Sequence, residues 1–222
     1  MEWKPNAPIF ADRLDAGRQL GEELRLRGYG DEPAIVLAIP RGGVPVAHAV
    51  TQALGTPLEV IIPGKLRLPG QPETAFGAIV PDGTLLLNLS QVESLDLEAE
   101  EIKRLAAETL SEMRRQTQVY CDKRPPLNLE GKTVILVDDG LASGFTMLAA
   151  VRAVRRHAPA RVVVAVPVSP FSAVDRLAPL VDDLVCLVER DDTGYAIAHA
   201  YTDWADLSDD QVCTFLRNIQ TQ

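Results

Sequence analysis

The residues best suited to chemistry are two adjacent carboxylates, Asp138 and Asp139, which follow an apolar run and precede a loop of small residues. The apolar run is typical of a strand buried on both faces, and ligands of open α/β sheets bind beyond the carboxyl ends of such strands. The loop opens directly into a predicted helix, whose first backbone N–H groups attract anions. Ser143 and Thr146 add hydroxyl donors. Residues 138–146 therefore predict an anion site beside two acids.

A carboxylate pair repels an anion unless a neutral or cationic group lies between them. Ribose hydroxyls meet this condition, and so does Mg²⁺, which takes oxygen ligands and keeps several of its waters. A phosphate on the loop and hydroxyls at the acids match the shape of a ribose 5-phosphate. The segment is not a P-loop, because no Gly-Lys-Ser/Thr follows, and it lacks the GxGxxG fingerprint. The residues also allow a plain strand–turn–helix in which an Asp caps the helix.

A second candidate site is the tetrapeptide Pro40-Arg41-Gly42-Gly43, which stands between an apolar run and a predicted helix. Two glycines expose backbone N–H groups, and the guanidinium fork of Arg41 lies beside them, an arrangement that suits a diphosphate. The alternative is an ordinary strand-to-helix turn whose arginine faces water.

Charged residues after the predicted strand 58–62 can reach the same ligand. Lys65 carries a flexible ammonium group near the carboxyl end of that strand. Arg67 is typical of a solvated loop arginine. Glu73, in a polar segment rich in Pro and Gly, is a candidate catalytic-loop carboxylate, although such a segment is also typical of an ordinary connector.

The elements that must position these residues alternate between strand and helix. Strands are predicted at 34–39, 58–62, 133–137, 162–166 and 184–188, and helices at 10–27, 44–54, 97–120, 146–157, 172–180 and 209–217. The alternation predicts an α/β fold, doubly wound, with a mainly parallel sheet and flanking helices.

The middle of the chain breaks this alternation. Residues 63–72 are too rich in Pro and Gly for regular structure, and 76–80 pairs with 84–87 as a hairpin around Asp82-Gly83. We expect a single domain. Its parts are a core over about 30–65 and 130–190, a hairpin and long-helix insertion over about 66–124, and a small cap from about 1–12 and 190–222.

Residues 134–146 resemble the 5-phosphoribosyl-1-pyrophosphate (PRPP) binding motif of the type I phosphoribosyltransferases. The shared pattern is four apolar residues, two acids, two variable positions and a small-residue loop with Gly and Thr. That family usually has Thr where Ser143 stands, and serine keeps the hydroxyl. The likeness extends over about 10–216. Three short sequence motifs are similar to those of a group of predicted bacterial and archaeal phosphoribosyltransferases: Asp12-Arg13, Pro40-Arg41-Gly42-Gly43-Val44-Pro45 and Val137-Asp138-Asp139-Gly140.

The resemblance implies transfer of 5-phosphoribose from PRPP to a nitrogen acceptor, with release of pyrophosphate and Mg²⁺ as cofactor, in nucleotide or nucleoside metabolism. It implies catalytic roles for Arg41, Lys65, Asp138 and Asp139, and it implies that the two acids contact Mg²⁺, partly through ligand or water. The PRPP-binding residues it implies are Arg41, Gly42, Gly43, Lys65, Asp138, Asp139, Gly140, Leu141, Ala142, Ser143, Gly144, Phe145 and Thr146. In the family the loop at Pro40–Gly43 often carries a cis peptide, and 66–80 takes the place of a mobile loop.

The acceptor is not fixed by these residues. In the resembled family, enzymes for hypoxanthine or guanine carry an Asp four places after the first acid, where this sequence has Ala142, so we expect a nucleobase other than a 6-oxopurine. The cap corresponds to the family's hood, which holds the acceptor. Tyr195, Tyr201 and Trp204 gather there in a chain with 5% aromatic residues. A flat base can stack on such rings, and the rings can equally cover the sheet edge.

Composition limits the partners. The net charge of −9, from 31 acids and 22 bases, argues against a general nucleic-acid binder. No stretch is apolar enough for a membrane span, and the N-terminus lacks an apolar signal core. Cys121, Cys186 and Cys213 are far apart, which predicts a reduced, cytoplasmic setting.

Two other function classes stay open. A PRPP- or nucleotide-sensing regulator on the same fold would keep the phosphate site and lose the chemistry; the basic cluster at 152–161 would then serve a nucleic acid. A protein-interaction scaffold using the helix at 97–120 would bind no PRPP. The same helix is the candidate interface of a homodimer, which is common in the resembled family.

Overall fold

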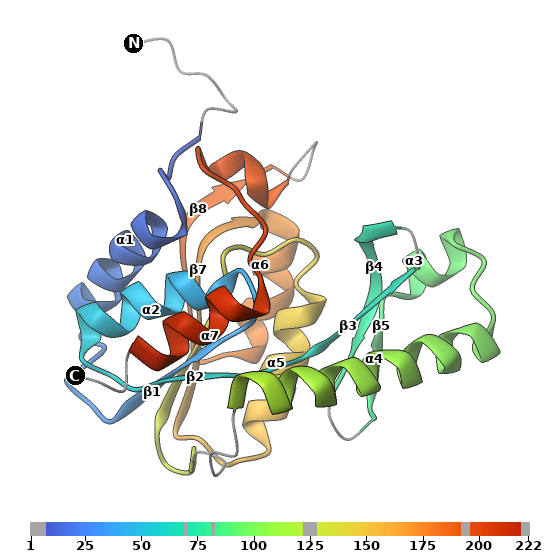
Figure 1. The fold of residues 1–222 in the computed structure, drawn as a ribbon, viewed down its shortest axis with the longest axis horizontal. Coiled ribbons are helices and arrows are strands. Elements are labelled where there is room, and N and C mark those ends of the chain that lie inside the picture. Colours follow the sequence, from blue (N-terminus) through green and yellow to red (C-terminus); the bar gives the residue numbers. More distant parts are fainter. Residues whose placement is uncertain (1–7, 69–70, 81–82, 122–127, 192–195, 219–222) are drawn as a thin grey trace.

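The computed structural model describes residues 8–68, 71–80, 83–121, 128–191 and 196–218, and its elements alternate as in an α/β protein (Figure 1). The strands are β1 (Ala34–Ala38), β2 (Leu58–Val60), β3 (Gly64–Leu68), β4 (Gln71–Ile79), β5 (Leu85–Leu87), β6 (Thr133–Val137), β7 (Arg161–Pro170) and β8 (Asp183–Arg190). The helices are α1 (Arg13–Leu26), α2 (Gly43–Leu54), α3 (Leu89–Ser94), α4 (Ala99–Cys121), α5 (Phe145–Arg155), α6 (Phe171–Leu177) and α7 (Asp209–Asn218), with short 3₁₀ helices η1 (Ala178–Leu180) and η2 (Ile197–Ala200).

Five strands form a wholly parallel sheet in the order β2-β1-β6-β7-β8. The central strands β1 and β6 are buried at every position, because alternate side chains enter two different layers. Val36 and Ala38 pack with α1, α2 and α7, whereas Ile35 and Leu37 pack with α5 and α6. The predicted doubly wound sheet is confirmed. Because β1 and β6 pair directly, their carboxyl ends lie side by side.

The strands β3, β4 and β5 form a separate antiparallel sheet, which projects from the body together with α3 and α4 (Figure 1). The prediction that 63–72 lacks regular structure is wrong, because β3 spans Gly64–Leu68 and β4 begins at Gln71. Cross-strand pairing outweighs the local preference of Pro and Gly: Leu66 pairs with Gly77 and is fully buried. The predicted hairpin is confirmed as β4 and β5.

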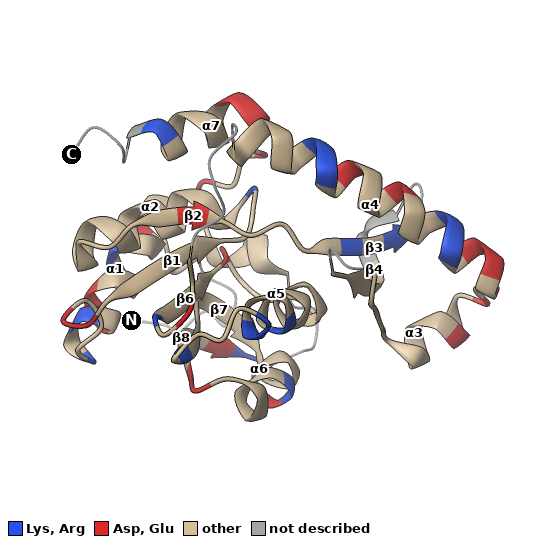
Figure 2. Cartoon of the chain, turned by 90° about the horizontal axis from the view of Figure 1, so that it is seen from below, with Lys and Arg blue, Asp and Glu red and all other residues tan. Residues whose placement is uncertain are grey.

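A glycine lets the long helix α4 lie close on this arm. A Cβ at Gly64 would stand 2.5 Å from Met113 Sδ and 2.7 Å from Thr109 Cγ2, both on α4. Helix α4 carries acids and bases along its length (Figure 2), several of them paired within the helix, such as Lys103 with Glu100. Along the described ranges, no helix is long and apolar enough to span a membrane.

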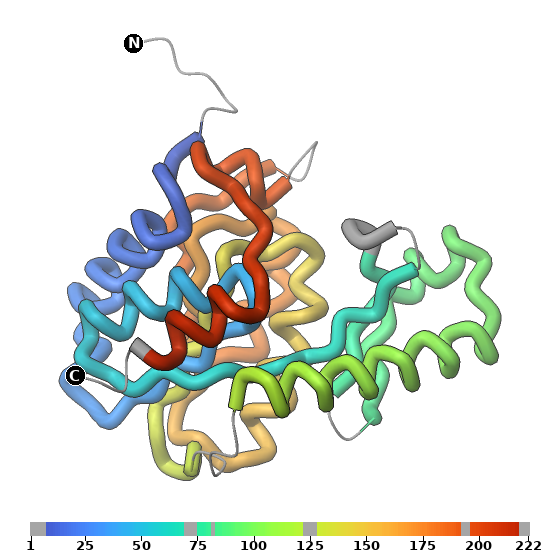
Figure 3. The backbone as a smooth tube through the Cα atoms, in the orientation of Figure 1, coloured from blue at the N-terminus to red at the C-terminus, as the bar shows by residue number. Residues whose placement is uncertain are grey.

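The segment before α1 lies beside the segment around residue 200 (Figure 3). Phe10 forms a parallel bridge with Tyr201, and the backbone N–H groups of Ile9 and Phe10 both donate to the carbonyl of Ala200 at 2.9 Å. Helix α1 begins at Arg13 rather than Phe10, because Asp12 caps it by accepting a hydrogen bond from the Asp15 N–H at 2.7 Å. The segment before α1 is therefore free to join the C-terminal segment.

Candidate functional site

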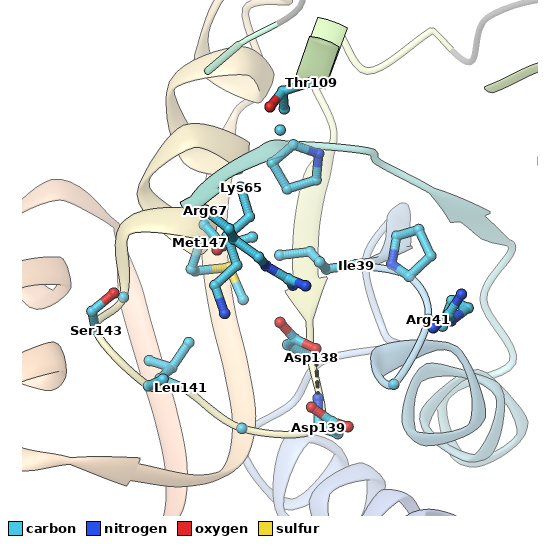
Figure 4. A pocket seen from close by; sticks show the side chains of 18 of the residues that line it. Ile39, Arg41, Lys65, Arg67, Thr109, Asp138, Asp139, Leu141, Ser143 and Met147 are labelled. Carbon is cyan, nitrogen blue, oxygen red and sulfur yellow. Dashed lines mark hydrogen bonds between the residues drawn. The ribbon is translucent and has the colours of Figure 1, made fainter. Parts of the chain in front are cut away.

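A cavity of about 520 Å³ lies at the carboxyl ends of β1 and β6, facing β3 and α4 (Figure 4). This volume is within the range of about 300–1,000 Å³ that is usual for small-molecule sites. Every residue predicted to bind PRPP lines the cavity except Gly43 and Phe145. Two sites that are about one hundred residues apart in the sequence, 40–43 and 138–146, thus form one wall.

The two acids of the pair have different environments. Asp138 is half-buried, and its Oδ1 accepts a hydrogen bond from the backbone N–H of Asp139 at 2.8 Å. Asp139 is 7% exposed, and its Oδ2 accepts a hydrogen bond from Arg13 Nε at 2.8 Å. Asp138 is therefore the acid open to a ligand, whereas Asp139 joins the cavity wall to the start of α1.

Burial governs the ionisation of both acids. It raises the pKa of Asp138 well above its ordinary value, the charge of Asp139 adds to the rise, and Lys65 opposes it. Burial also raises the pKa of Asp139, and the ion pair with Arg13 opposes that rise. Hydrogen-bond donors or positive charge brought by a ligand would favour the ionised form of Asp138.

Arg13 was not predicted as a site residue from the sequence, although Asp12-Arg13 is one of the sequence motifs on which the resemblance rests. Besides Asp139, it donates through Nη1 to the carbonyl of Ala205 at 2.8 Å. Its guanidinium lies 3.7 Å from the centre of the Trp204 ring. One side chain therefore links the acid pair to the C-terminal segment.

The loop after β1 packs directly on the acid pair. A Cβ at Gly42 would lie 1.9 Å from Asp139 Oδ2, and one at Gly43 would lie 2.7 Å from the carbonyl oxygen of Val137, so neither position has room for a side chain. The Pro40–Arg41 peptide bond is cis. The Arg41 guanidinium extends away from the acids (Figure 4), and its Nη1 lies 3.9 Å from Asp209 Oδ1 on α7.

The small-residue loop wraps one end of the cavity. Ser143, Gly144 and Thr146 line it, and Gly144 precedes α5 with a φ of +77°, a left-handed conformation that glycine adopts without strain. Phe145 points elsewhere, with the guanidinium of Arg176 4.7 Å from its ring centre. The loop therefore presents backbone and hydroxyl groups, as an anion site requires.

The cations after β2 come from a strand rather than a loop. Lys65 and Arg67 both line the cavity from β3, and their nitrogen ends point toward the side where Asp138 lies (Figure 4). Arg67, which the sequence indicated as solvated, thus borders the site. Glu73 lies in β4, but its side chain is outside the described residues.

Two of the aromatic residues predicted for the acceptor, Tyr201 and Trp204, do not line the cavity. Tyr201 is 4% exposed, stacks between Phe10 and Trp204, and donates through its hydroxyl to the carbonyl of Asp139 at 2.5 Å. Tyr195 is outside the described residues. Among the described residues of the C-terminal segment, Ile197 lines the cavity; it packs against Gly140, where a Cβ would lie 2.8 Å from Ile197 Cγ2.

Helix α4 supplies a polar wall that the sequence did not predict. Glu108, Thr109, Glu112, Met113 and Gln116 line the cavity from this helix. Their spacing of three and four residues shows that they share one helix face. The sequence predicted a helix over 97–120 but gave no sign of which part of the molecule its faces would contact.

Three comparisons with known proteins agree with this geometry. The family model of the phosphoribosyl transferase domain matches residues 10–192. A protein of Mycobacterium tuberculosis strain H37Rv, named "Putative phosphoribosyl transferase Rv0571c", is 39% identical over 208 residues, which are 94% of this chain and 46% of that protein. Its counterpart from strain CDC 1551 gives the same figures. The chain spans about half the length of these curated relatives. The crystal structure of TT1426 from Thermus thermophilus is 36% identical, with a TM-score of 0.75, and the match covers 95% of this chain and 98% of that one.

Proposed function

The chain belongs to the phosphoribosyl transferase domain family, and from this premise we propose that it transfers the 5-phosphoribosyl group of PRPP to a nitrogen acceptor. One observation carries the proposal. A single cavity joins the small-residue loop, the acid pair and the 40–43 loop in that order, which suits the 5-phosphate, the ribose hydroxyls and the diphosphate of one PRPP molecule.

In the proposed reaction the acceptor nitrogen attacks C1 of the ribose. A C1–N bond forms, the C1–O bond to the diphosphate breaks, pyrophosphate leaves with the bonding electrons, and the proton on the nitrogen passes to solvent. The sugar gains positive charge in the transition state, which the carboxylate of Asp138 stabilises. Lys65, Arg67 and a reoriented Arg41 stabilise the negative charge that develops on the leaving group.

Mg²⁺ fits the donors at this site in a limited way. The described residues offer no cluster of three metal-binding side chains, and Arg13 already occupies Asp139 Oδ2. Mg²⁺ typically uses one or two carboxylates, several waters and substrate phosphates, so one open acid is sufficient when PRPP supplies the rest. We therefore assign the Mg²⁺ contact to Asp138, directly or through water. When bound, the ion would supply positive charge to the diphosphate.

We propose that the acceptor is a nucleobase other than a 6-oxopurine, because Ala142 lines the cavity where the 6-oxopurine enzymes of the resembled family carry an Asp. The hood proposed here consists of 8–12 and 196–205, with Ile197 at its cavity face. Tyr201 and Trp204 support that face from behind, by their contacts with Asp139 and Arg13. A homodimer through α4 and a cytoplasmic setting stay predictions.

A sensor without transferase activity is the second candidate. Its support in the sequence was the basic cluster at 152–161. Two of those bases have local partners: Arg155 pairs with Asp182 at 2.9 Å, and Arg161 donates to the hydroxyl of Tyr29 at 3.1 Å. These contacts give two bases of the cluster a structural role that needs no nucleic acid, and they therefore favour the enzyme over the sensor.

Two measurements test the proposal. Calorimetry with PRPP and Mg²⁺ is expected to show binding, and pyrophosphate release is expected with at least one member of a panel of adenine, uracil, orotate, 6-oxopurines and simple amines. The double variant Asp138→Asn with Asp139→Asn is expected to release none, while Asp175→Asn, an exposed acid on α6, keeps the wild-type rate. Binding without release by any acceptor would favour the sensor, and absence of binding would contradict both.

A further inference from the structure

Helix α6 contacts the small-residue loop from outside the cavity. Arg176 of α6 donates a hydrogen bond through Nη1 to the carbonyl oxygen of Ser143. The same guanidinium lies 4.7 Å from the centre of the Phe145 ring. Ala173 of α6 is 3.3 Å from the position of a Cβ on Gly144. Of the residues that the structure describes, those of α6 do not line the cavity, so this helix supports the loop from its far side.

The contact with Ser143 fixes the direction of a peptide group. The peptide bond between Ser143 and Gly144 is not cis, and in a trans peptide the C=O and the following N–H point in opposite directions. Because Arg176 holds the carbonyl toward α6, the N–H of Gly144 points away from α6 and toward the cavity that both residues line. Within the described part of the chain, nothing accepts a hydrogen bond from that N–H.

The positive charge of Arg176 also makes the loop more attractive to an anion. Among the described carboxylates, none forms an ion pair with this arginine, whereas arginines such as Arg13, Arg25 and Arg155 have such a partner. Its hydrogen bond therefore polarises the Ser143–Gly144 peptide and increases the positive character of the N–H. A half-buried cation therefore stands behind the loop, on the side opposite the cavity.

We propose that Arg176 is a positioning residue for the 5-phosphate: it holds the Ser143–Gly144 peptide with its N–H directed into the cavity and supplies positive charge behind it. The inference rests on the proposed function, because the phosphate in question is that of PRPP. It extends that function to a side chain that never touches the ligand. Arg176 serves the 5-phosphate end alone, since the diphosphate end is formed by Arg41, Gly42 and Lys65.

The test compares three ligands by calorimetry in wild type and Arg176→Met. Ribose 5-phosphate and PRPP are expected to bind about tenfold more weakly to the variant, the effect of losing one charge-assisted interaction. Inorganic pyrophosphate, which lacks a 5-phosphate, is expected to bind within about twofold of wild type. In turnover the KM for PRPP rises while kcat changes little. Arg155→Met is the matched control, because Arg155 also contacts a backbone carbonyl nearby, that of Leu180, without touching the loop.

Arg176→Lys keeps the charge and one donor but loses the planar contact with Phe145, so its affinity for ribose 5-phosphate is expected to lie between those of wild type and Arg176→Met. This variant also tests the proposal if Arg176→Met fails to fold. Equal weakening of all three ligands, or unchanged binding of ribose 5-phosphate, would overturn the role of Arg176. A wild-type protein that binds neither PRPP nor ribose 5-phosphate would instead overturn the proposed function, and this inference with it.

Discussion

Asp138 and Asp139 are chemically identical neighbours, and their different partners give them different tasks. Arg13 compensates the charge of Asp139 across a 2.8 Å ion pair whose two side chains are each 11% exposed. Asp138 has a backbone N–H as its hydrogen-bond partner and the more distant charge of Lys65, and burial keeps its pKa high. Asp139 is therefore held in an ion pair within the folded chain, whereas Asp138 is left open to a ligand at a cost in stability.

Asparagine substitutions are expected to separate these roles. Asp138→Asn removes a buried charge, so at pH 7 the free energy of unfolding should rise, while pyrophosphate release falls about 100-fold or more. The folded-state pKa of Asp138 is raised, so the stability gained by Asp138→Asn should shrink as the pH falls through that pKa. The gain should vanish below about pH 3.8, where Asp138 is protonated in both the folded and the unfolded state. Asp139→Asn should lower stability by about 3–5 kcal/mol, since it leaves Arg13 buried without its partner.

Urea unfolding at pH 7 and pH 3.5, together with the pyrophosphate assay, measures both effects. Asp175→Asn serves as the control, because this exposed acid should change neither quantity. Loss of stability in Asp138→Asn equal to that in Asp139→Asn would contradict the division of roles.

At the scale of elements, the sequence was most informative where local and global preferences agree. The strand predicted at 133–137 is β6 to the residue, because an apolar run flanked by Gly131 and the acid pair has no competing structure. The strand at 64–68 was missed, because its pairing partner in β4 is separated from it by residues that favour turns. The polar face of α4 was missed for a related reason: periodicity identifies a face but not what it contacts.

Gly64 offers a test of how strongly the β3–α4 arm determines the site. In Gly64→Ala the new Cβ would meet Ile79, Met113 and Thr109 at 2.4–2.7 Å, so α4 must move away from β3. We expect a loss of about 1–3 kcal/mol in stability and a lower affinity for pyrophosphate, because Lys65 follows directly. Adding Met113→Ala should recover part of both losses by making space. Wild-type pyrophosphate affinity in Gly64→Ala would show that Lys65 does not depend on the packing of the arm.

At the scale of the whole molecule, the proposed function requires an acidic protein of net charge −9 to bind a polyanion. It gathers Lys65, Arg67 and Arg41 around one cavity and uses Arg13 to compensate one of the acids there. The pairing of Phe10 with Tyr201 makes this possible, because it brings Arg13 to the side chain of Asp139 and Tyr201 to its backbone carbonyl. The proposed hood thus contacts the acid pair through Tyr201 and lines the cavity through Ile197.

Three substitutions distinguish a supporting hood from one that binds the acceptor through its aromatic rings. Phe10→Ala empties a site that is 1% exposed and should cost about 3–5 kcal/mol of stability. Tyr201→Phe keeps the ring and loses the hydrogen bond to the Asp139 carbonyl, so stability should fall by about 1 kcal/mol.

Because Tyr201 does not line the cavity, loss of its hydroxyl should weaken PRPP binding a few-fold and leave the acceptor KM unchanged, whereas Ile197→Ala should raise the acceptor KM. Steady-state kinetics with both substrates measures this, and a raised acceptor KM in Tyr201→Phe with unchanged PRPP affinity would show that the ring itself contacts the acceptor.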